Sequence, residues 1–127
     1  MAINVLVVDD SAVMRSMLIR TLRLSGLPLT SVYQAGNGAE ALATLAAHEV
    51  DLALVDINMP VMNGEQLIDQ VRADARLAGV AIVVVSTEGS ETRIAALKAR
   101  GASFIHKPFT PEQVRTTVLR VLGVADA

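Results

Sequence analysis

DLALVDINMP, residues 51–60, contains an apolar run that ends at a single acidic residue, Asp56. Four consecutive apolar side chains at residues 52–55 are typical of a strand that is buried on both faces, as in a parallel sheet covered by helices. The carboxyl ends of strands in such sheets face the crevice where ligands bind. We therefore predict that Asp56 lies at the rim of a pocket. An aspartate that only caps the following loop is the plainer interpretation, and a second acidic group at the same rim argues against it.

Apolar runs and helical spacings alternate five times along the chain. The predicted strands cover residues 3–8, 31–35, 51–55, 80–85 and 103–106. The predicted helices follow them at residues 11–25, 39–48, 65–73 and 90–100, and from Pro111 to near Gly123. This alternation predicts an α/β fold with a parallel sheet and helices on both faces, so that all five strands end on one rim.

The helical stripes predict which side chains face the sheet. In order, they comprise residues 13, 14, 17, 18 and 21, then Ala41, Leu42, Leu45 and Ala46, then Leu67, Ile68 and Val71, and finally Val114, Val118, Val121 and Leu122. The helix at 90–100 has only a thin apolar stripe, so we expect it to be weakly anchored and able to shift.

Composition restricts the class of protein. The 127 residues show no break in composition, which predicts one domain over residues 1–127. Cysteine is absent, and no apolar run approaches the roughly 20 residues of a membrane span. We expect a soluble, cytoplasmic protein. A net charge of −2 at pH 7 is too balanced for a dedicated nucleic-acid binder, so no direct nucleic-acid partner is expected.

Four predicted strand ends bring polar groups to the rim. Asp9 and Asp10 follow the first strand, Asp56 the third, Ser86 the fourth and Lys107 the fifth. Two carboxylates about 4 Å apart repel by roughly 4 kcal/mol at an effective dielectric near 20, so three ionised aspartates need a cation. One lysine supplies one charge, and Mg²⁺ suits a site of a few carboxylates, water and a phosphoryl oxygen. The predicted ligands are the three aspartates and the backbone carbonyl of Asn58.

Such a site is equipped for phosphoryl chemistry. A carboxylate beside Mg²⁺ and an ammonium group can attack a phosphoryl group whose charge is neutralised on both sides, and Asp56 is the predicted nucleophile. The hydroxyl of Ser86 can then donate to a phosphoryl oxygen and draw its loop inward only while that group is present. This is a switch mechanism.

Four motifs together resemble the receiver domain of two-component response regulators, particularly single-domain regulators of the CheY type. They are VVDDS at residues 7–11, LVDINMPVMNG at 54–64, VVVST at 83–87 and HKPFTPE at 106–112. The resemblance implies a flavodoxin-like doubly wound fold with strand order 2-1-3-4-5. It also implies Mg²⁺ at the acidic pair, a cis Lys107-Pro108 bond, and phosphorylation of Asp56 by a histidine kinase or a histidine phosphotransfer protein. Self-phosphorylation from small phosphodonors and autodephosphorylation are expected, but no activity as an enzyme in the ordinary sense.

The same resemblance implies how the signal leaves the site. Ser86 moves toward the phosphoryl group and Phe104 rotates inward, changing the face made by the fourth helix, the fifth strand and the fifth helix, where a downstream protein binds. CheY-type regulators usually have tyrosine at the Phe104 position, and the segment before it is one residue shorter here. Asn58 and Glu88 resemble the family's variable positions that tune autodephosphorylation.

Other interpretations fit the residues less well. Haloacid dehalogenase-like phosphatases carry their aspartyl nucleophile in a D-x-D arrangement after the first strand, whereas this chain has Asp9, Asp10 and Ser11 there. An FMN carrier needs hydroxyls and amides where this chain has two acids. A protein-binding module without phosphorylation leaves the chemical groups unexplained. We expect a stand-alone, monomeric regulator, with chemotaxis as the leading pathway and a phosphorelay intermediate or a kinase-regulating receiver as alternatives.

Overall fold

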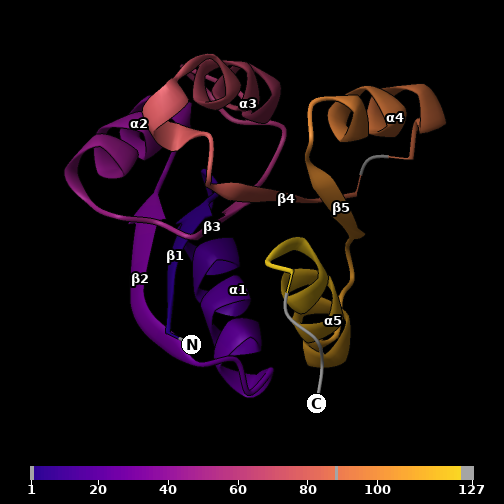
Figure 1. Ribbon diagram of the computed structural model, residues 1–127. Coiled ribbons are helices and arrows are strands. Elements are labelled where there is room, and N and C mark those ends of the chain that lie inside the picture. The colour runs from indigo at the N-terminus through magenta and orange to yellow at the C-terminus, as the bar shows by residue number, and fades with distance from the viewer. Residues whose placement is uncertain (1, 88, 124–127) are drawn as a thin grey trace.

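The computed structural model describes residues 2–87 and 89–123. In chain order its elements are β1 (Ile3–Val8), α1 (Ala12–Leu24), β2 (Leu29–Ala35), α2 (Gly38–Ala47), β3 (Leu52–Val55), α3 (Gly64–Ala73), the short 3₁₀ helix η1 (Ala75–Leu77), β4 (Ala81–Ser86), α4 (Glu91–Ala99), β5 (Ser103–His106) and α5 (Pro111–Val121). Figure 1 shows the helices arranged around the central sheet.

The five strands form one parallel sheet in the order β2-β1-β3-β4-β5. This order confirms the flavodoxin-like doubly wound fold. The chain starts at the interior strand β1, adds β2 on one side and then adds β3 to β5 on the other. The carboxyl ends of β1 and β3 are therefore neighbours, which places the residues after Val8 and Val55 side by side.

Two aliphatic cores cover the two faces of the sheet, because alternate residues of each strand point to opposite sides. On one face, Leu6 and Val8 of β1 pack with side chains of α2, α3 and α4. On the other, Val5 and Val7 pack with side chains of α1 and α5. Both faces of β3 are buried, as its unbroken apolar run predicts.

Side-chain caps fix where several helices begin. Ser11 accepts a hydrogen bond from the backbone N–H of Met14 at the start of α1. Thr110 and Gln113 form a capping box at the start of α5, with Pro111 in its first turn. A second capping box, between Asn63 and Gln66, begins α3 and was not predicted, although the N-x-x-Q spacing is a signal for it.

The predicted boundaries and stripes need several corrections. β2 begins at Leu29 rather than residue 31, because Leu29 pairs with Ile3 in the sheet. Val13 and Met17 are exposed, and Leu18 and Leu22 form the buried stripe of α1. Ala46 is exposed in α2.

The end of α5 also differs from the predicted stripe. Val121 and Leu122 are only partly buried, whereas Thr117 and Leu119 are buried. Both residues pack against the core from the last turn of the helix and just after it, where the cover is incomplete.

Candidate functional site

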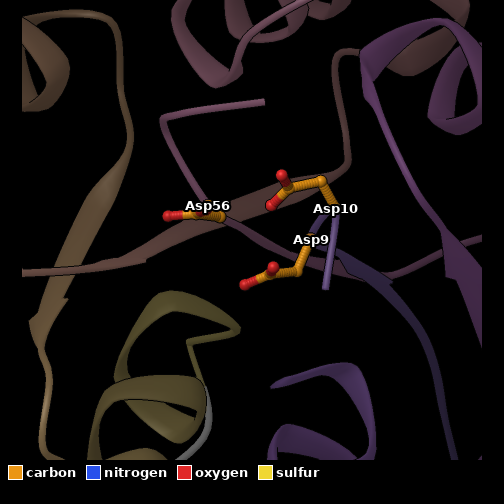
Figure 2. A group of neighbouring side chains, drawn as sticks. All are labelled: Asp9, Asp10 and Asp56. Carbon is orange, nitrogen blue, oxygen red and sulfur yellow. The ribbon is translucent and has the colours of Figure 1, made fainter. Parts of the chain in front are cut away.

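Three carboxylates meet at the carboxyl edge of the sheet. Asp9 and Asp10 follow β1, Asp56 follows β3, and one oxygen of each lies within 4.8 Å of the others. The backbone N–H of Asp56 donates to the carbonyl of Val8 at 2.9 Å, which extends the pairing of the two strands to the site. Figure 2 shows the three side chains extending to the same side of these strand ends.

Lys107 supplies a positive charge from a third strand end. Its Nζ lies 3.6 Å from Oδ2 of Asp9 and 3.9 Å from Oδ1 of Asp56. Its backbone N–H donates to the carbonyl of Ser86 at 2.9 Å, so the end of β4 holds the backbone of Lys107 in place. The following bond to Pro108 is cis, as the sequence resemblance implied. One ammonium group thus forms ion pairs with two carboxylates.

Asp9 is the most enclosed of the three aspartates, with 2% of its surface exposed. Its Oδ1 accepts a hydrogen bond from the backbone N–H of Ser11 at 2.9 Å. Its Oδ2 is buried and has no hydrogen-bond partner among residues 2–87 and 89–123, since the Nζ of Lys107 is too distant for one. A buried carboxylate oxygen without a hydrogen bond is costly, and it fits a cation held at this edge.

The pKa of Asp56 is raised above its ordinary value. Burial is the largest cause, because it penalises the charged form. Lys107 and the backbone N–H of Ile57 oppose that rise, whereas the charges of Asp9 and Asp10 add to it. A cation at the site would favour the ionised form, which is the form that can act as a nucleophile.

The loop after Asp56 is held by an exceptionally close backbone contact. The N–H of Gly64 donates to the carbonyl of Ile57 at 2.8 Å. A Cβ at Gly64 would lie 2.4 Å from the carbonyl oxygen of Asp56 and 2.9 Å from the Cα of Ile57. Only glycine fits here, so the absence of a side chain at residue 64 allows the start of α3 to pack against the backbone of Asp56. Val61, at the loop's exposed tip, has a φ of 66°, which is unusual for a β-branched residue.

The other predicted site residues lie in different surroundings. Ser86 is buried at the end of β4, and Asn58 is exposed in the loop after Asp56. Phe104 is half-buried on β5, packs against the core beneath α4, and contacts the ring of His106 edge-on with centroids 4.7 Å apart. Glu88 lies outside the described residues.

α4 is attached to α3 largely by charged side chains. Leu97 is its one buried residue. Arg93 pairs with Glu65, with Nη2 and Oε1 2.5 Å apart, and Arg100 pairs with Asp69 at 2.8 Å. Arg72 of α3 donates to the backbone carbonyl of Arg100 at 3.0 Å. These contacts were not predicted, because a stripe of apolar residues carries no information about cross-helix ion pairs.

A second hollow lies away from these carboxylates. It is a groove of about 990 Å³ between the end of α2 and η1, lined by residues such as His48, Asp51 and Arg76. Asp51 and Gly79 precede β3 and β4, so this groove lies at the amino edge of the sheet. It therefore has no part in the chemistry of the acidic cluster.

Comparisons with known proteins identify the family of this chain. The family model for the response regulator receiver domain matches residues 5–119. The chain belongs to the response regulator receiver domain family. Chemotaxis protein CheY1 of Helicobacter pylori is 40% identical over 125 residues, which cover 97% of this chain and 99% of that protein. A chemotaxis protein CheY homolog of Campylobacter jejuni is 40% identical over 122 residues, covering 94% and 92% of the two chains.

A solved structure of a receiver protein has the same fold. The structure of Vibrio cholerae chemotaxis protein CheY4 superposes with a TM-score of 0.83 at 36% identity, covering 95% of this chain and 99% of that one. Membership in the family makes this chain a signalling protein of the CheY-like type, and it rules out the phosphatase and flavin-carrier alternatives. Among the described residues, no helix is both long and apolar enough to cross a membrane.

Proposed function

We propose that residues 1–127 form a stand-alone response regulator that is switched by phosphorylation of Asp56. The observation that carries this proposal is the meeting of three carboxylates within 4.8 Å, next to one lysine that contacts two of them. A cluster with this net negative charge suits a hard divalent cation. The family's own chemistry supports the same assignment.

The residues fit a bound Mg²⁺. The hydrogen-bond-free Oδ2 of Asp9, a carboxylate from Asp10 and one from Asp56 are hard oxygen donors, and the backbone carbonyl of Asn58 is the fourth proposed ligand. The ion supplies neutralisation of the charge that builds up on the transferred phosphoryl group. This assignment accounts for an enclosed oxygen that lacks a hydrogen bond from the described part of the chain.

The chain's own residues have three roles in the transfer. A carboxylate oxygen of Asp56 attacks phosphorus, as the bond from phosphorus to the donor breaks. Lys107 contacts the reacting carboxylate and stabilises the phosphoryl oxygens as they approach. The hydroxyl of Ser86 donates to one of those oxygens after transfer. Asn58 and Glu88 tune how quickly water removes the phosphoryl group.

The signal is proposed to leave through α4, β5 and α5. When Ser86 moves toward the phosphoryl group, Phe104 follows inward from its half-buried position and loses its edge contact with His106. α4 can adjust at low cost, because one buried leucine and a few partly exposed ion pairs hold it. A downstream protein then recognises the altered face.

The phosphodonor is a sensor histidine kinase or a histidine phosphotransfer protein. α1 offers a surface beside the site for such a donor, since Val13 and Met17 are 72% and 53% exposed and lie one to two turns after Asp10. Chemotaxis is the proposed pathway, supported by the similarity to the chemotaxis proteins of Helicobacter pylori and Campylobacter jejuni. A phosphorelay intermediate or a kinase-regulating receiver is the alternative. The protein is proposed to act as a monomer, in the cytoplasm.

Acetyl phosphate tests the proposal without the unknown kinase. With Mg²⁺, the protein should gain one phosphoryl group, detected by intact mass, and EDTA should abolish the gain. Asp56→Asn should abolish it as well, whereas Glu49→Gln, an exposed acid outside the site, should leave it intact. Equal phosphorylation of Asp56→Asn and the wild type would contradict the assignment.

A pull-down identifies the output partner. The protein treated with beryllofluoride, a phosphoryl mimic, should retain a protein that the untreated form does not, and a flagellar-motor component would support chemotaxis. Onward transfer of the phosphoryl group to a histidine phosphotransfer protein would instead support the phosphorelay alternative.

A further inference from the structure

Arg15 reaches from the first turns of α1 back to the strand end that carries the acidic pair. Its Nη1 donates to the backbone carbonyl of Asp9 at 2.6 Å, and its Nε donates to Oε1 of Gln34 at 3.1 Å. Gln34 belongs to β2, which pairs with β1. The guanidinium therefore ties the end of β1 to the neighbouring edge strand.

We infer that Arg15 is a positioning residue for the metal site, which orients the Asp9-Asp10 backbone so that both carboxylates can hold the cation together. This inference rests on the proposed function, because it concerns the affinity of that site for Mg²⁺. Arg15 is not assigned a contact with the reacting atoms.

The covalent geometry of the peptide unit explains why a bond to Asp9 affects Asp10. The carbonyl of Asp9 and the nitrogen of Asp10 belong to one planar unit. Holding that carbonyl from the side of α1 fixes the plane, and with it the position of the Cα of Asp10, from which the side chain projects. The N–H of Asp9 donates to the carbonyl of Ala35 at 3.1 Å, so the preceding unit is already fixed.

Asp10 depends on this support more than its neighbour does. The side chain of Asp9 is buried and accepts a hydrogen bond from the backbone of Ser11. Asp10 is exposed, and within residues 2–87 and 89–123 its carboxylate makes no hydrogen bond or ion pair. Before a cation binds, the backbone is therefore what limits where its carboxylate can lie. A ligand with a free side chain on a fixed backbone loses less freedom on binding than one on a mobile backbone.

Positioning and simple electrostatics predict opposite effects of removing Arg15. As a cation near the carboxylates, Arg15 repels a divalent ion, so its loss would strengthen Mg²⁺ binding. As a clamp, it preorganises the ligands, so its loss would weaken Mg²⁺ binding. Arg15→Lys separates the two effects, because lysine keeps the charge but cannot make two directed bonds from one planar group.

Isothermal titration of the full chain with MgCl₂ measures the effect directly. Arg15→Lys should weaken Mg²⁺ binding about 10-fold, in the range known for residues that support metal ligands. Gln34→Ala leaves Arg15 in place and removes one of its two anchors at an exposed position, so it should weaken binding about 3-fold. Arg20→Lys is the matched control on the same helix, since Arg20 is exposed and makes no hydrogen bond or ion pair in the described part of the chain. It should bind as the wild type does.

Two further readouts distinguish a metal-positioning role from a merely structural one. Acetyl phosphate labelling of Arg15→Lys should require about 10-fold more Mg²⁺ but reach the wild-type rate at saturation. The melting temperature of Arg15→Lys in EDTA should stay close to that of the wild type, although its Mg²⁺ affinity falls. If Arg15→Lys binds Mg²⁺ within 2-fold of the wild type, or if Arg15→Gln binds it more tightly, the inference is overturned. Absence of Mg²⁺ binding by the wild type would overturn the proposed function itself.

Discussion

Replacing Asp56 by asparagine should stabilise the protein when metal is absent, although it removes the proposed phosphoacceptor. An ionised Asp56 has an oxygen within 4.8 Å of oxygens of both Asp9 and Asp10. Each such pair of carboxylates repels by roughly 3.5 kcal/mol at an effective dielectric near 20. The attraction between Asp56 and the Nζ of Lys107 at 3.9 Å offsets roughly 4 kcal/mol of this repulsion. Because water screens the exposed Asp10, we expect a net gain of about 2 kcal/mol in the free energy of unfolding of Asp56→Asn.

Thermal unfolding followed by circular dichroism in EDTA measures this gain. At about pH 7, the melting temperature of Asp56→Asn should exceed that of the wild type by roughly 6–10 °C for a domain of this size. Glu49→Gln removes one negative charge at an exposed position elsewhere, and it should shift the melting temperature by less than roughly 2 °C. Saturating Mg²⁺ should stabilise the wild type more than Asp56→Asn.

The pH dependence follows from the raised pKa of Asp56. A carboxyl whose pKa is higher in the folded than in the unfolded protein destabilises the fold at neutral pH. This penalty is lost as the pH falls through the raised folded value, because the native protein then takes up a proton. The advantage of Asp56→Asn should therefore shrink between about pH 7 and about pH 4. A melting temperature of Asp56→Asn at or below that of the wild type in EDTA at about pH 7 would refute the electrostatic reasoning.

Three further substitutions test the parts that surround Asp56. Gly64→Ala should cost at least about 2 kcal/mol in urea unfolding, because its Cβ would meet the backbone of Asp56 at 2.4 Å, whereas Gly79→Ala, with nothing within 4 Å, should cost nothing measurable. Val61→Asn should raise the free energy of unfolding by about 1 kcal/mol by relieving its φ of 66°, and an unchanged value would contradict the strain. Lys107→Met should destabilise the protein by about 2 kcal/mol at neutral pH and abolish acetyl phosphate labelling, and labelling at the wild-type rate would exclude the lysine from the transfer.

Much of the fold could be predicted because the strands are short apolar runs that end at polar residues. The run at residues 52–55 marked a strand buried on both faces, and the structure confirms it. Alternation with helical spacings predicted the parallel sheet. The strand order could not be derived from these patterns, which do not say which strands are neighbours. It came from the motif resemblance, and the structure confirms it.

The acidic cluster was predictable for a simple reason. Asp9, Asp10 and Asp56 come directly after strands, and parallel strands end on one edge, so their meeting followed from the fold class. What escaped prediction depends on side-chain reach. Arg15 clamps a backbone carbonyl six residues away, and Arg93 finds Glu65 across two helices. Such contacts depend on the helix phase and on relative placement, neither of which a linear pattern contains.

The buried face of α1 was also not predictable from the sequence pattern. Val13 and Met17 fit a helical apolar spacing, yet they face solvent, while Leu18 and Leu22 are buried. Two apolar stripes a quarter-turn apart are present in this segment, and the sheet can cover only one of them.

The most direct test of Asp56 as the phosphoacceptor locates the phosphoryl group on the chain. The protein is phosphorylated with acetyl phosphate and Mg²⁺, the acyl phosphate is reduced with borohydride to an alcohol, and the modified peptide is sequenced by mass spectrometry. We expect reduction at residue 56, with Asp9 and Asp10 unmodified because they hold the cation. Reduction at Asp9 or Asp10 instead would contradict the division of roles among the three carboxylates.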